Sequence, residues 1–156
     1  MTRRAARGTR ARMTYDPIAA EPPSPFPDLL GARLAAWSDG AATVELAIRA
    51  EHRNRSGVVH GGVLLTLIDQ AGAYAGLYCD VPGRVRKAVT VDLDCRFTGQ
   101  AREGVMRAEG RLVTRGTSIF FARTEIFGPD GALLAFGAST HRYRSGSERP
   151  EGVPRD

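Results

Sequence analysis

The sequence predicts an α+β fold in which one long central helix is wrapped by a curved antiparallel sheet of about six strands. Three observations indicate this arrangement. Two strand-like segments open the domain, one long segment has the period of a helix, and four further strand-like segments follow it. Strands and helices do not alternate along the chain, which argues against a doubly wound parallel sheet.

The first two strands are expected at residues 34–37 and 42–48, on either side of the turn Ser38-Asp39-Gly40. An Asp-Gly pair supplies the positive φ angles that tight hairpins require. These two segments are therefore predicted to pair as an antiparallel hairpin.

The central helix is predicted over residues 61–79, where apolar side chains recur at steps of three and four residues. Most other positions in the segment are also apolar or small, so the helix is expected to be buried by the sheet rather than to lie on the surface. His60, Thr66, Asp69 and Gln70, with several glycines and alanines, make it a poor membrane span.

Four strands are expected after the helix, at residues 89–97, 105–113, 117–127 and 133–143, connected by short hairpins. In the first of them apolar and polar residues alternate, which predicts one buried face. That face would carry Val91, Leu93, Cys95 and Phe97.

The domain is predicted to span residues 26–143, between a basic, proline-rich disordered tail (1–25) and a polar disordered tail (144–156). Five of the 22 Lys and Arg residues lie in the first twelve positions, which leaves 17 to balance 17 Asp and Glu. A neutral folded part argues against a nucleic-acid partner. Cys79 and Cys95 show neither zinc-ligand nor disulfide spacing, and a cytoplasmic protein with reduced thiols is expected.

Asp69 is the only formally charged residue between Gly61 and Cys79. Burying an unpaired carboxylate costs several kcal/mol, so such a group is usually paired, protonated or functional. The alternatives are that Asp69 faces a local gap open to solvent or bonds a neutral partner such as Gln70.

Gly61 and Gly62 follow His60 at the predicted start of the helix. Backbone N–H groups there carry the positive end of the helix dipole and can hold an oxyanion, although paired glycines also allow close packing. Eight residues separate Gly61 from Asp69, which is roughly 12 Å along a helix. If both act on one bond, a two-fold dimer must bring the Asp69 of one subunit near the Gly61 of the other.

Asn54, His60-Gly61-Gly62 and Asp69 together resemble the signature of hotdog-fold acyl-CoA thioesterases of the phenylacetate-pathway (PaaI) type. The segments Thr90-Val91-Asp92-Leu93, Thr114-Arg115-Gly116-Thr117 and Ser139-Thr140-His141-Arg142 also fit that family. The resemblance covers residues 26–143.

The resemblance implies hydrolysis of a CoA thioester in a site shared between subunits. Gly61 would donate its N–H to the thioester oxygen, and His60 would shape that turn. Asp69 would act as a general base toward water or as a nucleophile. Asn54 would orient water or the carbonyl group, and Thr90 would bond the water or Asp69. Because a thiolate leaves readily, no separate general acid is needed.

Coenzyme A would be part of the substrate, and neither a further cofactor nor a metal is expected. The candidate contacts to the CoA ester are Gly62, Arg84, Lys87, Asp92, Arg115, Gly116 and Thr117. Many family members carry a second basic residue where this chain has Thr117. A dimer, or a dimer of dimers, is expected, without a membrane partner.

Two other functions share the predicted fold: an acyl-CoA-binding protein without turnover, and an enoyl-CoA hydratase or dehydratase. A serine hydrolase is disfavoured because the chain lacks a G-x-S-x-G elbow. His52, His60 and His141 are not spaced as metal ligands.

Overall fold

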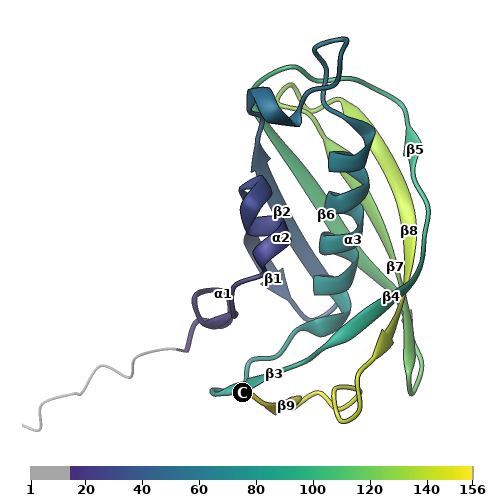
Figure 1. Cartoon of the computed structure of the whole chain (residues 1–156). Helices are drawn as coiled ribbons and strands as arrows, with labels where there is room; N and C mark the ends of the chain where they lie inside the picture. The colour runs from purple at the N-terminus through teal and green to yellow at the C-terminus, as the bar shows by residue number, and fades with distance from the viewer. Residues whose placement is uncertain (1–14, 156) are drawn as a thin grey trace, which may run out of the picture.

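A long helix, α3 (Gly61–Leu77), lies against an antiparallel sheet that curves around it (Figure 1). The computed structural model describes residues 15–155. The strand order in the sheet is β1-β2-β6-β7-β8-β4, with β5 also paired to β8. The strands are β1 (Ala32–Ser38), β2 (Ala41–Ala47), β4 (Ala88–Leu93), β5 (Arg96–Phe97), β6 (Val105–Arg115), β7 (Ile119–Phe127) and β8 (Leu133–Tyr143). The predicted fold class is therefore confirmed.

The remaining elements are short. Two small helices, α1 (Pro17–Ala20) and α2 (Pro25–Leu30), precede the sheet and contact β1. A 3-10 turn, η1 (Ala50–His52), lies between β2 and α3, and the strands β3 (Arg84–Val85) and β9 (Val153–Pro154) pair with each other. No helix of residues 15–155 is long and apolar enough to cross a membrane.

The predicted hairpin forms between β1 and β2, with Ser38 opposite Ala41 and Gly40 at a φ of +80°. Helix α3 buries its apolar side chains against the sheet, and Leu67, Ile68 and Ala71 have no exposed surface. Gly76 faces the sheet too, since a Cβ there would lie 2.1 Å from the Phe120 ring. The small residues of α3 thus let the helix approach the sheet closely.

The prediction for residues 89–97 is wrong in two respects. This segment joins the open edge of the sheet beside β8, and the chain then crosses to β6 instead of forming a hairpin with it. The register between β4 and β8 also shifts between Thr90 and Asp92, so Val91 is the extra residue of a bulge and lies on the outer face. Leu93 and Cys95 pack against the core as predicted. Val91 and Phe97, which were expected to be buried, are each 58% exposed.

The described parts of both predicted tails are ordered, contrary to expectation. Asp16 caps α1 by accepting a 3.0 Å hydrogen bond from the Ile18 N–H. At the other end, Arg86 is buried and donates to the carbonyl oxygens of Ser147 (2.9 Å) and Glu148 (3.3 Å). Guanidinium groups bonded to backbone carbonyls hold a segment with few apolar residues. Residues 1–14 and 156 of the predicted tails lie outside the described residues.

Candidate active site

The start of α3 presents one free backbone donor. His60 is the N-cap residue, and its Nδ1 accepts a 2.9 Å hydrogen bond from the Gly62 N–H. The N–H of Gly61 has no acceptor among residues 15–155. The Phe97 ring lies beside it, 3.1 Å from the position of the Cβ that Gly61 lacks. The cap therefore uses the Gly62 N–H and leaves the Gly61 N–H without an acceptor in residues 15–155.

Asn54 organises the loop that leads into α3. Its Oδ1 accepts hydrogen bonds from the backbone N–H groups of Ser56 (2.9 Å) and Val58 (3.4 Å). The backbone N–H of Asn54 donates to the Val58 carbonyl oxygen at 2.8 Å. Because the side-chain oxygen is occupied by the turn, only the amide nitrogen of Asn54 is left for water or substrate.

Asp69, in the middle of α3, has a partner from β4. The Thr90 hydroxyl donates a 2.6 Å hydrogen bond to Asp69 Oδ1. Thr90 Oγ1 also lies 3.3 Å from His141 Nδ1, and His141 Nε2 lies 2.9 Å from Ser139 Oγ. One row of hydrogen-bonded polar groups thus runs from Asp69 of α3 through Thr90 of β4 to His141 and Ser139 of β8.

His141 and Ser139 are the members of this row to which the sequence analysis gave no role. Both are buried, with 1% and 2% of their surface exposed. Burial lowers the pKa of His141, and the negative charge of Asp69 opposes that effect. The Phe120 ring stacks on the imidazole at 4.9 Å between centroids. The available signal was the Ser-x-His spacing, which places both side chains on one face of a strand.

A cavity of about 340 Å³ opens beside Asp69 and also contains Thr90 and His141 in its wall. Residues 21–24, from the segment predicted to be a disordered tail, also line this cavity. Burial raises the pKa of Glu21 in this wall to about 7, although the positive charge of Arg155 partly offsets the effect. The cavity is therefore lined by two carboxyl groups, that of Asp69, which Thr90 holds, and that of Glu21 from the N-terminal segment.

Tyr74 is the aromatic residue that lines this cavity. Burial and the charges of Glu21 and Asp28 raise the pKa of Tyr74 to about 12. Trp37 packs edge-on against the Tyr74 ring and donates to the Tyr74 carbonyl oxygen at 2.7 Å. Tyr74 therefore adds a phenol group to the wall formed by α3.

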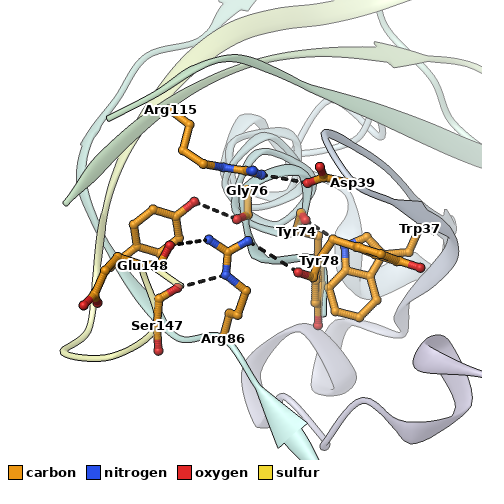
Figure 2. Close-up of polar contacts among 10 residues, drawn as sticks. Trp37, Asp39, Tyr74, Gly76, Tyr78, Arg86, Arg115, Ser147 and Glu148 are labelled. Carbon is orange, nitrogen blue, oxygen red and sulfur yellow. Dashed lines mark hydrogen bonds and ion pairs between the residues drawn. The ribbon is translucent and has the colours of Figure 1, made fainter. Parts of the chain in front are cut away.

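Two of the arginines predicted to contact coenzyme A have partners within the chain. Arg84 donates to the carbonyl oxygens of Glu151 (2.7 Å) and Gly152 (2.6 Å). Arg115 forms a 2.8 Å ion pair with Asp39 (Figure 2). Arg84 thus orders the C-terminal segment with two of its five N–H donors, and its contact with a phosphate group stays a prediction.

The other predicted contacts are scattered over the molecule. Lys87 is exposed at the rim of the Asp69 cavity, and Asp92 is exposed on β4. Gly116 and Thr117 form the turn between β6 and β7. Asp69, Thr90 and Lys87 are therefore brought to one cavity, whereas Gly61 lies at the distant start of the same helix. At 1.5 Å per residue, eight residues separate Gly61 from Asp69 by roughly 12 Å.

The fold is that of the hotdog thioesterases. A model of the Thioesterase superfamily matches residues 56–135, which include the start of α3, Asp69 and Thr90. The chain belongs to this superfamily.

Individual relatives agree with the family match. A candidate esterase of Saccharolobus solfataricus is 30% identical over 96 residues, which are 62% of this chain and 66% of that protein, just under two thirds of its length. A candidate esterase of Archaeoglobus fulgidus is 29% identical over 124 residues, which cover 79% of this chain and 77% of that protein.

Solved structures share the fold. A thioesterase of Haemophilus influenzae superposes with a TM-score of 0.68 at 21% identity, covering 76% of this chain and 81% of that one. The Escherichia coli PaaI protein from the phenylacetic acid degradation operon superposes with a TM-score of 0.69 at 23% identity, covering 78% and 86% of the two chains.

Proposed function

We propose that this protein is a PaaI-type acyl-CoA thioesterase that hydrolyses a CoA ester to a free acid and coenzyme A. The observation that carries the proposal is Asp69 itself, a carboxylate in the middle of the buried helix, held by the Thr90 hydroxyl at 2.6 Å and open to a cavity of about 340 Å³. The superfamily match and the thioesterases among its structural neighbours support the same reaction class.

In the proposed reaction, Asp69 takes a proton from water as the water oxygen bonds to the thioester carbon. The carbonyl oxygen gains negative charge, which the Gly61 N–H at the positive end of α3 stabilises. The C–S bond then breaks, and coenzyme A leaves as a thiolate that recovers the proton. A direct attack by Asp69, through an anhydride, uses the same two groups. The pKa of a thiol, about 8.5, makes a separate general acid unnecessary.

The proposed site needs two copies of the chain because Asp69 and Gly61 are too far apart in one. The open edge of β4 supports such a dimer, since it presents Val89, Val91 and the nearby Phe97 to solvent. Exposed apolar edge strands are places where a second strand pairs. Two β4 strands paired antiparallel about a two-fold axis would set the two α3 helices antiparallel and give two equivalent sites.

The test is hydrolysis of a panel of acyl- and aryl-CoA esters, followed with a thiol reagent. We expect the wild type to turn over at least one ester and Asp69→Asn to lose about 100-fold or more of kcat while remaining folded. The matched control is Asp80→Asn, which changes an exposed carboxylate just after α3.

Two results would contradict the proposal. Tight binding of CoA esters without any turnover would identify an acyl-CoA-binding protein. Hydration of an enoyl-CoA without release of thiol would identify a hydratase.

A further inference from the structure

The row of polar groups behind Asp69 has a fixed order of donors and acceptors. A hydroxyl group has one hydrogen, and Thr90 gives it to Asp69 Oδ1 at 2.6 Å. The Thr90 oxygen can therefore only accept from His141 Nδ1, 3.3 Å away, so that nitrogen must carry a hydrogen. The His141 ring is therefore either the neutral tautomer with its hydrogen on Nδ1 or the charged form with a hydrogen on both nitrogens.

The second ring nitrogen decides between these forms. Burial lowers the pKa of His141, which favours the neutral ring at neutral pH. In a neutral ring with Nδ1–H, Nε2 is an acceptor, and its only partner among residues 15–155 is the Ser139 hydroxyl at 2.9 Å. Ser139 therefore donates to His141, His141 to Thr90, and Thr90 to Asp69.

The surroundings hold this order in place. The imidazole is stacked on Phe120 with an interplanar angle of 20°, and neither His141 nor Ser139 has more than 2% of its surface exposed. Gly72 of α3 makes room for the pair, because a Cβ there would lie 2.2 Å from Ser139 Oγ. Water cannot readily replace His141 or Ser139, so the exposed Thr90 hydroxyl takes its inner partner from the protein.

We propose that His141 is a positioning residue for hydrolysis: its neutral Nδ1–H holds the Thr90 oxygen, which directs the Thr90 hydrogen at Asp69 Oδ1 and leaves Oδ2 free for the reacting water. This inference rests on the proposed function. His141 touches neither substrate nor water in this role, and it acts only through Thr90. Without the Nδ1–H the Thr90 hydroxyl is free to rotate, and the carboxylate loses its fixed orientation.

The first test is spectroscopic and needs no substrate. The chain has three histidines, and in His52 and His60 it is Nδ1 that accepts a backbone N–H, from Arg49 and Gly62 respectively. The 3.0 Å bond to His52 Nδ1 is shorter than the 3.5 Å approach of the Arg49 guanidinium to His52 Nε2, so both rings are expected as Nε2–H when neutral. His141 should then give the single Nδ1–H pattern. Nitrogen chemical shifts of histidine-labelled protein at pH 8 measure this directly, and His141→Asn identifies the signal by its loss. An Nε2–H pattern for His141 would overturn the proposal.

The second test is kinetic and compares two substitutions. Asn carries an amide N–H near the place of Nδ1, so His141→Asn should keep most of the activity. His141→Leu removes the donor and should lower kcat about tenfold with little change in KM, the effect expected from losing a hydrogen bond that supports a charged group. Equal losses in the two variants, or a loss confined to KM, would count against the assigned role.

A double-mutant cycle separates the assigned role from general damage to the core. Thr90→Val removes the hydroxyl through which His141 acts, so adding His141→Leu to it should lower kcat no further. A full additional tenfold loss in the Thr90→Val background would overturn the proposal. If the wild type hydrolyses no ester, or if Asp69→Asn retains activity, the proposed function fails instead, and the tautomer measurement still decides the order of donors.

Discussion

Gly72 of α3 and Ser139 of β8 are in such close contact that a Cβ at position 72 would lie 2.2 Å from Ser139 Oγ. The same Ser139 hydroxyl is 2.9 Å from His141 Nε2, at the far end of the row of groups that leads to Asp69. The contact between Gly72 and Ser139 therefore links the packing of α3 on the sheet to the row of groups behind Asp69.

Gly72→Ala is expected to destabilise the protein by about 1–3 kcal/mol, because a methyl group must displace the Ser139 side chain from a packed core. Thermal and urea denaturation measure the change. The double variant Gly72→Ala/Ser139→Ala should recover part of the loss, since the nearest remaining Ser139 atom, its Cβ, lies at 3.4 Å. A double variant less stable than Gly72→Ala would show that the contact is not the cause.

Glu21 should make the stability of the protein depend on pH. Burial raises its pKa from 4.5 to about 7, so the folded state binds the proton more tightly than the unfolded state. The wild type is then expected to lose stability as pH rises from 4.5 through 7. The Gln side chain of Glu21→Gln does not ionise, so this variant should be more stable than the wild type at pH 8. The expected difference is about 1–2 kcal/mol, because solvent screening reduces the effect of a partly buried carboxyl group.

The comparison at pH 4.5 provides the internal control for Glu21. There the wild-type carboxyl is protonated in the folded state, and the two proteins should differ little in the free energy of unfolding. Glu103→Gln, a change at an exposed carboxylate, is the matched variant and should show no such pH-dependent gain. A Glu21→Gln gain of the same size at both pH values would contradict the explanation.

Val91 on the open edge of β4 should contribute to dimer formation. Burying a valine side chain is worth about 1.5–3 kcal/mol, so Val91→Lys is expected to raise the dissociation constant of the dimer at least tenfold. Sedimentation at a series of protein concentrations measures this. Val113→Lys is the control, because Val113 is 64% exposed on β6, in the interior of the sheet. Unchanged association of Val91→Lys would exclude the β4 edge as the interface.

Arg84 and Arg86 are expected to act on stability and not on coenzyme A binding. Arg86 donates to three backbone carbonyl oxygens and stacks over the Tyr143 ring at 4.7 Å. Arg86→Met should therefore lower the free energy of unfolding by about 2–4 kcal/mol, since it removes several charge-assisted hydrogen bonds. Arg84→Met should leave the KM for CoA esters unchanged. A several-fold increase in that KM would place Arg84 at the substrate site.

The sequence alone determined the fold class. Its apolar residues repeat every two residues in the strands and about every 3.6 residues in one segment only, which is the central helix. It also singled out Asp69, since one acid in an otherwise uncharged helix stands out in the printed letters. It marked Gly61 for a similar reason, because glycines at a helix start leave backbone donors uncovered.

Tertiary structure alone decided which groups surround Asp69 and which strands lie at an edge. Thr90, His141 and Ser139 come from strands far apart in the chain, and their donor order follows from distances that no spacing encodes. The bulge after Thr90 reversed the expected burial of Val91, because Val91 is the extra residue of the bulge and lies on the outer face. The ends of the chain were misjudged because arginine side chains and backbone carbonyls, not apolar residues, hold the C-terminal segment in place.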